Sequence, residues 1–334
     1  MARSRRIITW AGLGLSLLCA GANLSAAGSS TPIPYAGRDI SFKAKKSATL
    51  WWNGKTEAVV YWEYHAAPDK WRVEYLAPAS ARGRVMIRRG GTIWQWEPRQ
   101  KRVYVTSGDE LVDEADTLDP LLSKNYNIQS ISKTKREADR WCSMLRVTPR
   151  HEGKSKWLLW TDRDTGIILK RERYGPHGEL EMALQCLEFI PGKQDSTLFD
   201  SKHLPAGKIV KRNWPGKNPS QAELRDILGI NPPSELEGGF KLRSSAIVGN
   251  PQTAQLMYTD GLLTISLFAS PAGSPSKSNR DHGHPVRLGK LDAVASTFGH
   301  LASVTWHVGK HSYTLVGGVG EHQLLDIAGS LPTR

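Results

Sequence analysis

The chain has 334 residues, of which 39% are hydrophobic and 23% are charged, and its formal net charge is +13. This composition excludes a disordered chain and a protein with many membrane spans, and the length predicts about two domains. The strongly basic balance indicates an anionic partner, such as a membrane surface, an anionic lipid or an acidic protein.

The N-terminus has the three parts of a secretory signal. Three arginines lie within the first six residues, an apolar run covers residues 7–18, and small and polar residues follow in "CAGANLSAAGSS". We predict that residues 1–27 are a signal peptide cleaved near Ala27, with a retained single-span anchor as the alternative. The mature protein is then exported, so nucleic acid is not an expected partner.

Residues 40–189 consist mostly of short segments in which apolar and polar residues alternate, with Pro, Gly and Asp turns between them. Such a run predicts a meander of antiparallel strands in a highly curved sheet or barrel. Large aromatic side chains recur on these strands, where a small core would usually take Val and Leu. They either fill the core or line an apolar hollow for a lipid chain; the candidates are Trp71, Val73, Tyr75, Val85, Ile87, Trp94 and Trp96.

The meander is interrupted at residues 108–124, where leucines recur at helical spacing and acidic residues cluster toward the start. We expect one or two short helices there. Strands then resume. The "DRDTG" run at residues 162–166 is interpreted as a hairpin turn, because its glycine does not stand where a calcium-binding loop requires one.

Pro, Gly, Lys and Asn dominate the segment after residue 191. We predict a basic linker over residues 196–232, with a short helix capped by Ser220. Its cations are either solvated or contacts for an anionic partner, and the candidate contacts are Lys208, Lys211, Arg212 and Lys217. Strands and a final helix follow, so residues 233–334 are predicted to form a smaller α+β domain.

The sequence contains no nucleophile elbow, zinc-protease motif, phosphate-binding loop or dinucleotide fingerprint. We therefore expect neither enzyme activity nor a cofactor. Asp281, His282 and His284 lie in a Gly/Pro/Ser-rich loop that does not fix metal geometry, so no metal site is predicted. An oxidising compartment allows a disulfide between Cys142 and Cys186; two separate buried thiols are the alternative.

Several runs resemble one known family. In the first half they are "WRVEYLAP", "TIWQWEP", "LLSKNYNIQ", "WCSMLRVTPR" and "WTDRDTGIILKRERYGPHGELEMALQCLEF", and in the second half "GGFKL", "LMYTDGLLTISLF" and "YTLVGGVGEHQLLDIAGSL". Together they are similar to the RseB/MucB proteins, the periplasmic regulators of the sigma-E envelope-stress pathway. The resemblance covers about residues 40–333.

This resemblance implies a fold. Residues 28–195 would form an unclosed antiparallel half-barrel of the LolA/LolB type, covered by short helices around an apolar cavity. Residues 233–334 would form the smaller C-terminal domain of the family. The expected fold class is α+β, mainly β.

The resemblance also implies a function. The family binds the periplasmic part of a membrane-anchored anti-sigma factor (RseA/MucA-like), shields it from proteolysis, and releases it when lipid or lipopolysaccharide enters the larger domain. Much of the partner contact lies in the second domain, where Tyr258 and Asp260 of the "YTDGL" run are expected contacts. The alternative is a periplasmic lipid or lipoprotein carrier of the LolA type, which needs only the half-barrel. The oligomeric state stays open, a homodimer included.

Overall fold

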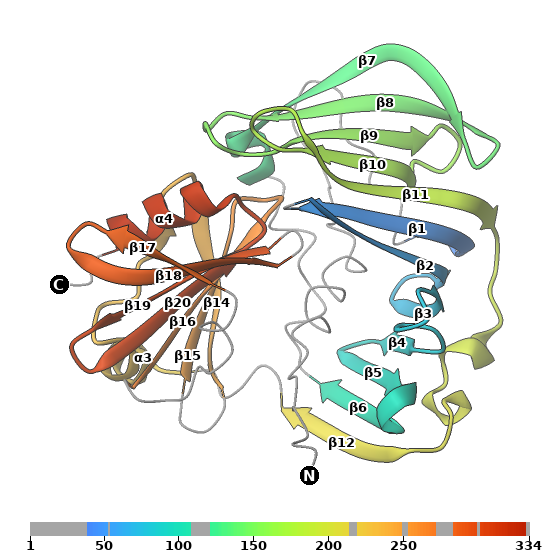
Figure 1. Ribbon diagram of the computed structural model, residues 1–334. Helices are drawn as coiled ribbons and strands as arrows, with labels where there is room; N and C mark the ends of the chain where they lie inside the picture. Colours follow the sequence, from blue (N-terminus) through green and yellow to red (C-terminus); the bar gives the residue numbers. More distant parts are fainter. Residues whose placement is uncertain are drawn as a thin grey trace.

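The computed structural model of the chain describes residues 39–52, 54–107, 121–213, 219–248, 253–271, 283–298 and 301–331. Within these residues the chain forms two β-sheets that lie side by side (Figure 1). The signal peptide predicted for residues 1–27 and most of the helical segment predicted for 108–124 lie outside the described residues. In the described part, no helix combines the length and apolarity needed to cross a membrane.

The first sheet contains twelve of the described strands, with short 3-10 helices between some of them. Its elements are β1 (Phe42–Trp52), β2 (Lys55–Ala66), β3 (Lys70–Ala77), β4 (Val85–Arg89), β5 (Thr92–Glu97), η1 (Pro98–Gln100), β6 (Arg102–Ser107), β7 (Tyr126–Glu137), β8 (Arg140–Pro149), β9 (Lys156–Asp162), β10 (Ile168–Tyr174), β11 (Leu180–Pro191), η3 (Ser196–Phe199), η4 (Ser201–His203) and β12 (Lys208–Asn213).

Strand β1 lies in the middle of this sheet, because it pairs antiparallel with β2 on one side and with β11 on the other. Along β1 every second residue is buried, which is the period of a strand with one face toward a core. Antiparallel pairs continue outward to β6 and to β7, and β12 joins β6 in parallel. The outermost described strands, β12 and β7, do not pair with each other, so the sheet is an open, curved arc (Figure 1). The predicted unclosed antiparallel sheet is confirmed.

The second sheet contains eight of the described strands, all antiparallel to their neighbours, in the order β13-β14-β15-β16-β20-β19-β18-β17. The elements of this domain are α3 (Gln221–Leu228), β13 (Glu235–Leu236), β14 (Phe240–Val248), β15 (Thr253–Thr259), β16 (Thr264–Pro271), β17 (His284–Leu288), β18 (Leu291–Phe298), β19 (Leu301–Val308), β20 (His311–Gly317) and α4 (Glu321–Ser330). Helix α4 packs against β17 to β20, and α3 packs against β15 and β16. The predicted α+β domain is confirmed.

The segment predicted as a linker, residues 196–232, has structure that belongs to both domains. Phe199 and Leu204, from η3 and the end of η4, are buried on the first sheet, and β12 is its edge strand. Helix α3 belongs to the second domain. As predicted, Ser220 caps α3: its hydroxyl accepts from the Glu223 N–H, and the Glu223 side chain accepts from the Ser220 N–H.

The two domains share one hydrophobic core. From the first domain it contains Leu50, Leu122, Tyr126, Leu145, Val147, Trp157, Leu159 and Met182. From the second domain it contains residues such as Phe240, Leu256, Tyr258, Ile265 and Leu324. Each fully buried side chain of this size contributes about 1.5–3 kcal/mol. The shared core therefore holds the two domains together and buries the junction between them.

Candidate functional site

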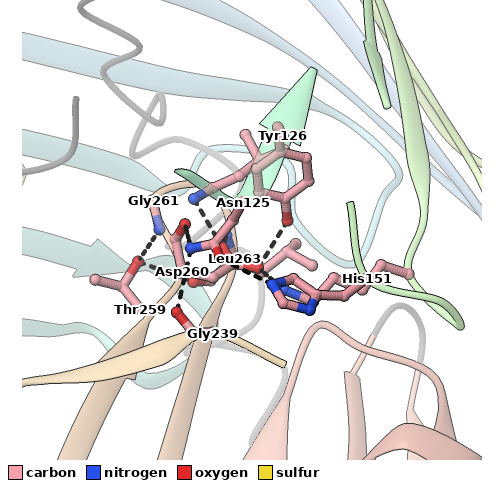
Figure 2. Close-up of polar contacts among 10 residues, drawn as sticks. Asn125, Tyr126, His151, Gly239, Thr259, Asp260, Gly261 and Leu263 are labelled. Carbon is pink, nitrogen blue, oxygen red and sulfur yellow. Dashed lines mark hydrogen bonds and ion pairs between the residues drawn. The ribbon is translucent and has the colours of Figure 1, made fainter. Parts of the chain in front are cut away.

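The most completely buried polar cluster in the described residues lies at the domain junction and is centred on Asp260 (Figure 2). Asp260 follows β15 in the turn that leads to β16. Its Oδ1 accepts hydrogen bonds from the backbone N–H groups of Leu262 and Leu263, at 2.9 and 2.8 Å. Short polar side chains stabilise turns in this way by bonding to the backbone two or three residues ahead. One half of the carboxylate is therefore used to shape its own turn.

The other half of the carboxylate is bound by the first domain. Asp260 Oδ2 accepts a hydrogen bond of 2.7 Å from the Tyr126 hydroxyl and forms an ion pair with the Lys154 ammonium. The side chains of Lys154 and Asp260 are both fully buried. The Lys154 ammonium also lies 4.3 Å from the ring centre of Phe240 in the second domain. Both charges are thus compensated inside the junction, which a buried ion pair requires.

Asn125 closes the cluster beside Tyr126. Its Nδ2 donates to two second-domain carbonyls, that of Asp260 at 2.8 Å and that of Gly239 at 3.2 Å. Its Oδ1 accepts from His151 Nε2 at 3.0 Å, as Figure 2 shows. A buried amide is stable only when its donors and acceptor are satisfied, and here they are. Asn125 consequently holds two loops of the second domain against the first.

Two glycines let the second-domain loops approach the first domain closely. Gly261 has φ +100° and Gly239 has φ +82°, a region that side chains with a Cβ rarely adopt. A Cβ on Gly261 would lie 2.5 Å from the backbone nitrogen of Leu122, and one on Gly239 would collide with the Asn125 side chain. These positions therefore need glycine both for backbone conformation and for space.

Burial shifts the titration of the groups around Asp260. Burial, together with the Asp260 charge and hydrogen bond, raises the pKa of Tyr126 well above its usual value, so the phenol stays neutral and donates. Burial lowers the pKa of Lys154, and the Asp260 charge opposes this effect. The pKa of His151 is lowered by burial and by the Lys154 charge. The charge of Asp260 therefore helps Lys154 to stay protonated inside the junction.

A second polar contact crosses the junction nearby. Arg173 forms a 2.8 Å ion pair with Glu181 and donates through Nη1 to the Gly318 carbonyl of the second domain at 3.2 Å. Together with the Asp260 cluster it fixes the second domain against the part of the first sheet that contains β7 to β11. Both oxygens of the Asp260 carboxylate are occupied by contacts that hold the structure together. The arrangement is therefore a latch between the domains rather than a reactive site. We call Asn125, Tyr126, Lys154 and Asp260 the junction latch.

The seven predicted lipid-cavity residues lie on β3, β4 and β5, and the strand register divides them between two faces of the sheet. Residues directly opposite one another in an antiparallel pair share a face. Trp71 lies opposite Arg88, and Val73 lies opposite Met86. With Tyr75 two residues further along β3, these side chains form one face, which we call the inner face.

The other four candidates lie on the opposite, outer face. Val85 lies opposite Trp96, and Ile87 lies opposite Trp94. They pack beneath the protein's own residues 198–204. A single cavity lined by all seven candidates therefore does not form, and Ile87 and Trp96 are core residues, buried under η3 and η4.

The inner face leads to the domain junction. Val73 and Tyr75 pack with Ala48 and Leu184. Two residues along β1, on the same face, Leu50 belongs to the core shared by the two domains. Val73 and Tyr75 thus lie on the same face of the sheet as Leu50, in a cluster of buried side chains that neighbours the junction core.

The predicted partner contacts lie in two different places, some exposed on β12 and others buried at the domain junction. Lys208 and Lys211 are exposed on β12, whereas the side chain of Arg212 and the whole of Lys217 lie outside the described residues. Tyr258 and Asp260 are fully buried: the Tyr258 hydroxyl donates to the Pro233 carbonyl, and Asp260 forms the junction latch. Their prediction as partner contacts is corrected, because no partner can reach them in this structure.

Cys142 and Cys186 are free and buried. Burial raises the pKa of both Cys142 and Cys186 to about 11, so both are neutral thiols at physiological pH. Asp281 and His282 lie outside the described residues, and His284 pairs with Glu321 at 2.8 Å. Within the described ranges, no group of three or more His, Cys, Asp or Glu side chains is arranged to hold a metal.

Comparison with known proteins identifies the first domain. Residues 47–195 match the MucB/RseB N-terminal domain. The chain therefore carries a MucB/RseB N-terminal domain. The sigma-E factor regulatory protein RseB of Salmonella typhimurium is 24% identical over 226 residues, 62% of this chain and 65% of that protein. The RseB protein of Escherichia coli K12 is 23% identical over 234 residues, 65% of this chain and 67% of that protein.

Solved MucB structures share the fold across both domains. The complex of Pseudomonas aeruginosa MucA and MucB matches with a TM-score of 0.59 and 22% identity, over 88% of this chain and 93% of the matched chain. MucB in complex with MucA(peri) matches with a TM-score of 0.58 and 21% identity, over 88% and 93%. The matched region of the Salmonella relative is slightly less than two thirds of its length. The fold of these MucB structures therefore extends over both domains of this chain.

Sequence reasoning missed the first-domain half of the latch. Lys154 lies in the loop "EGKSKW", which carries no motif. Asn125 and Tyr126 stand in the run "LLSKNYNIQ", and the resemblance of that run to the MucB/RseB family is the one signal that could have pointed to them.

Proposed function

We propose that this chain is a periplasmic protein that binds the periplasmic part of a membrane-anchored anti-sigma factor and thereby restrains an envelope-stress sigma factor. One observation carries the proposal: a MucB/RseB N-terminal domain continues into a second domain with the MucB fold, and MucB relatives are solved in complex with MucA. The signal peptide predicted for residues 1–27 supports export.

The junction favours a regulator over a lipid carrier. A carrier of the half-barrel type needs only the first domain. Here the second domain shares a hydrophobic core with the first and is held by the fully buried Lys154–Asp260 pair. A partner therefore meets the two domains as one body, and partner affinity depends on how they are arranged.

We further propose that a lipid or lipopolysaccharide acyl chain acts from the inner face. Burying an acyl chain gains about 0.8 kcal/mol per CH₂ group. A chain lodged beside Val73 and Tyr75 would displace Ala48 and Leu184, which lie two residues along β1 and β11 from Leu50 and Met182 of the shared core. The ligand weakens partner binding only if it binds the partner-free arrangement of the protein more tightly than the partner-bound arrangement.

The test uses the mature chain and the periplasmic polypeptide of the MucA-type anti-sigma factor from the same organism. Calorimetry should detect a specific complex, and added lipid A should weaken it. Lipid binding without any complex would contradict the regulator and support a carrier. A complex whose affinity lipid A leaves unchanged would support the anti-sigma factor as the partner but contradict its proposed release by lipid.

A further inference from the structure

Strand β12 forms one edge of the first sheet. It pairs in parallel with β6, with Lys208 beside Arg102 and Lys211 beside Val105. Among the described strands, none pairs with its other side. An edge strand presents a row of backbone donors and acceptors to which another extended chain can bind.

The register shows which backbone groups face outward. Lys208 N–H donates to the Lys101 carbonyl at 3.0 Å, so the backbone of Lys208 faces β6. In a parallel ladder the residues that bond to one neighbour alternate with those that point away. The N–H and C=O groups of Ile209 and Lys211 therefore point toward the open edge.

The side chains at this edge are apolar and basic. Ile209 is 64% exposed, which is more than any other exposed large hydrophobic residue in the described part of the chain. Exposed lysines, Lys208 and Lys211, stand on either side of it in the strand. Lysine on an edge strand discourages pairing with another copy of the same strand.

The surrounding charge is of one sign. Residues 98–107, which include β6, contain Arg99, Lys101 and Arg102 and no acidic residue. Residues 201–213, which include β12, contain four further Lys and Arg residues and again no acid. A second copy of this edge would be repelled, whereas an acidic segment would be attracted.

We propose that β12 is a docking strand, to which an extended acidic segment of the partner adds as a further strand of the sheet. This inference rests on the proposed function and names a contact site for the anti-sigma polypeptide. Main-chain bonds to Ile209 and Lys211 give affinity, and a carboxylate beside each lysine with an apolar side chain over Ile209 gives specificity. A membrane surface could use the charges of this edge but not its outward-pointing backbone groups.

The test combines two probes with two variants of the mature chain. One probe is the anti-sigma periplasmic polypeptide. The other is a synthetic peptide of repeating Glu-Val-Val-Glu, about as long as β12, so that glutamates meet both lysines and a valine meets Ile209. A lysine–valine peptide of the same pattern is its charge control. Ile209→Pro removes an outward N–H that β6 does not use, and proline is tolerated at such edge positions. Ile209→Thr keeps this N–H and is the matched control.

Amide hydrogen exchange and affinity are measured together. Both the anti-sigma polypeptide and the glutamate–valine peptide should slow exchange at Ile209 and Lys211, while Val210 is already protected by β6. Ile209→Pro should weaken binding about tenfold, equivalent to about 1.4 kcal/mol, and Ile209→Thr only two- to threefold. Added salt should weaken binding of wild-type protein.

Several outcomes would overturn the proposal. One is a bound anti-sigma polypeptide that leaves both amides unprotected and Ile209→Pro at wild-type affinity; the proposed function would then stand without this site. Protection by the glutamate–valine peptide, with no detectable complex between the protein and the anti-sigma polypeptide, would overturn the assignment of this partner and contradict the proposed function. Binding to phosphatidylglycerol vesicles with no peptide binding would assign the edge to a membrane surface.

Discussion

Among conservative changes to the junction latch, Asp260→Asn should weaken the contact between the two domains most. The amide can still accept from the Leu262 and Leu263 N–H groups, which bind Oδ1. It loses the negative charge that compensates Lys154, whose side chain is fully buried. The variant therefore keeps its local turn and leaves an uncompensated ammonium inside the junction.

The structure sets the size of the effect. Removing one partner of a buried ion pair costs about 3–5 kcal/mol, against a typical total stability of about 5–15 kcal/mol. Lys154→Met should cost less, about 2–3 kcal/mol, because the carboxylate keeps the Tyr126 hydroxyl and two backbone donors. In the double variant both charges are gone, so its loss should fall short of the sum by about 1–3 kcal/mol.

Urea unfolding followed by tryptophan fluorescence measures these free energies. Trp157 and Trp306 are buried, one in each domain, so both domains report. Asp292→Asn is the matched control, because its ion pair with Arg287 at 3.0 Å is largely exposed and its loss should be too small to resolve. Equal losses for Asp260→Asn and Asp292→Asn, or strict additivity in the double variant, would refute the role assigned to the buried pair.

Three further predictions concern other parts of the molecule. Burial lowers the pKa of His65, so its neutral ring contributes stability above pH 6.5 that is lost as pH falls through the folded-state pKa. The Tm should therefore fall between about pH 7.5 and pH 5, and less so in His65→Phe; an unchanged slope would count against this assignment. Trp71→Ala, on the inner face, should weaken lipid A binding several-fold while Trp94→Ala, on the outer face, leaves it unchanged; equal effects would disprove the assignment of faces. Gly261→Ala should cost more than about 2 kcal/mol in urea unfolding, because it adds a clash with the first domain to backbone strain. Gly289→Ala, with a positive φ but open space around it, should cost only about 1 kcal/mol, and similar losses would exclude the clash.

The sequence predicted strands well and their faces poorly. Alternation within β3 correctly places Trp71 and Val73 on one face, because the side-chain period along a strand is two. The phase between strands depends on register, which the turns set and alternation does not. Trp94 and Trp96 therefore appeared equivalent to Trp71 in the sequence, although pairing places them on the opposite face.

The junction latch could not be predicted because its members are far apart in the chain. Lys154 is 106 residues from Asp260, and Tyr126 is 134 residues from it. An aspartate before glycine in "YTDGL" is typical of an exposed turn. Only the tertiary structure shows that this turn is buried against the first domain and that its carboxylate bonds across the junction.

Strand β12 could not be predicted, because its composition resembles that of a linker. Its six residues follow a Pro- and Gly-containing stretch and are rich in Lys and Arg, which is typical of a linker. Its partner β6 lies about a hundred residues earlier, and parallel pairing with so distant a strand leaves no local signal. The basic character of the segment was visible in the sequence, whereas its place at the sheet edge was not.

Protection of the anti-sigma polypeptide from cleavage is the sharpest test of the proposed regulatory role. The periplasmic polypeptide of the MucA-type anti-sigma factor is exposed to a trace of broad-specificity protease, with and without the mature chain, and intact polypeptide is measured over time. Wild-type protein should slow the cleavage, Asp260→Asn should protect less, and lipid A should restore the unprotected rate. Cleavage at the same rate with and without the wild-type chain, under conditions where that chain is folded and binds lipid A, would contradict the proposed role.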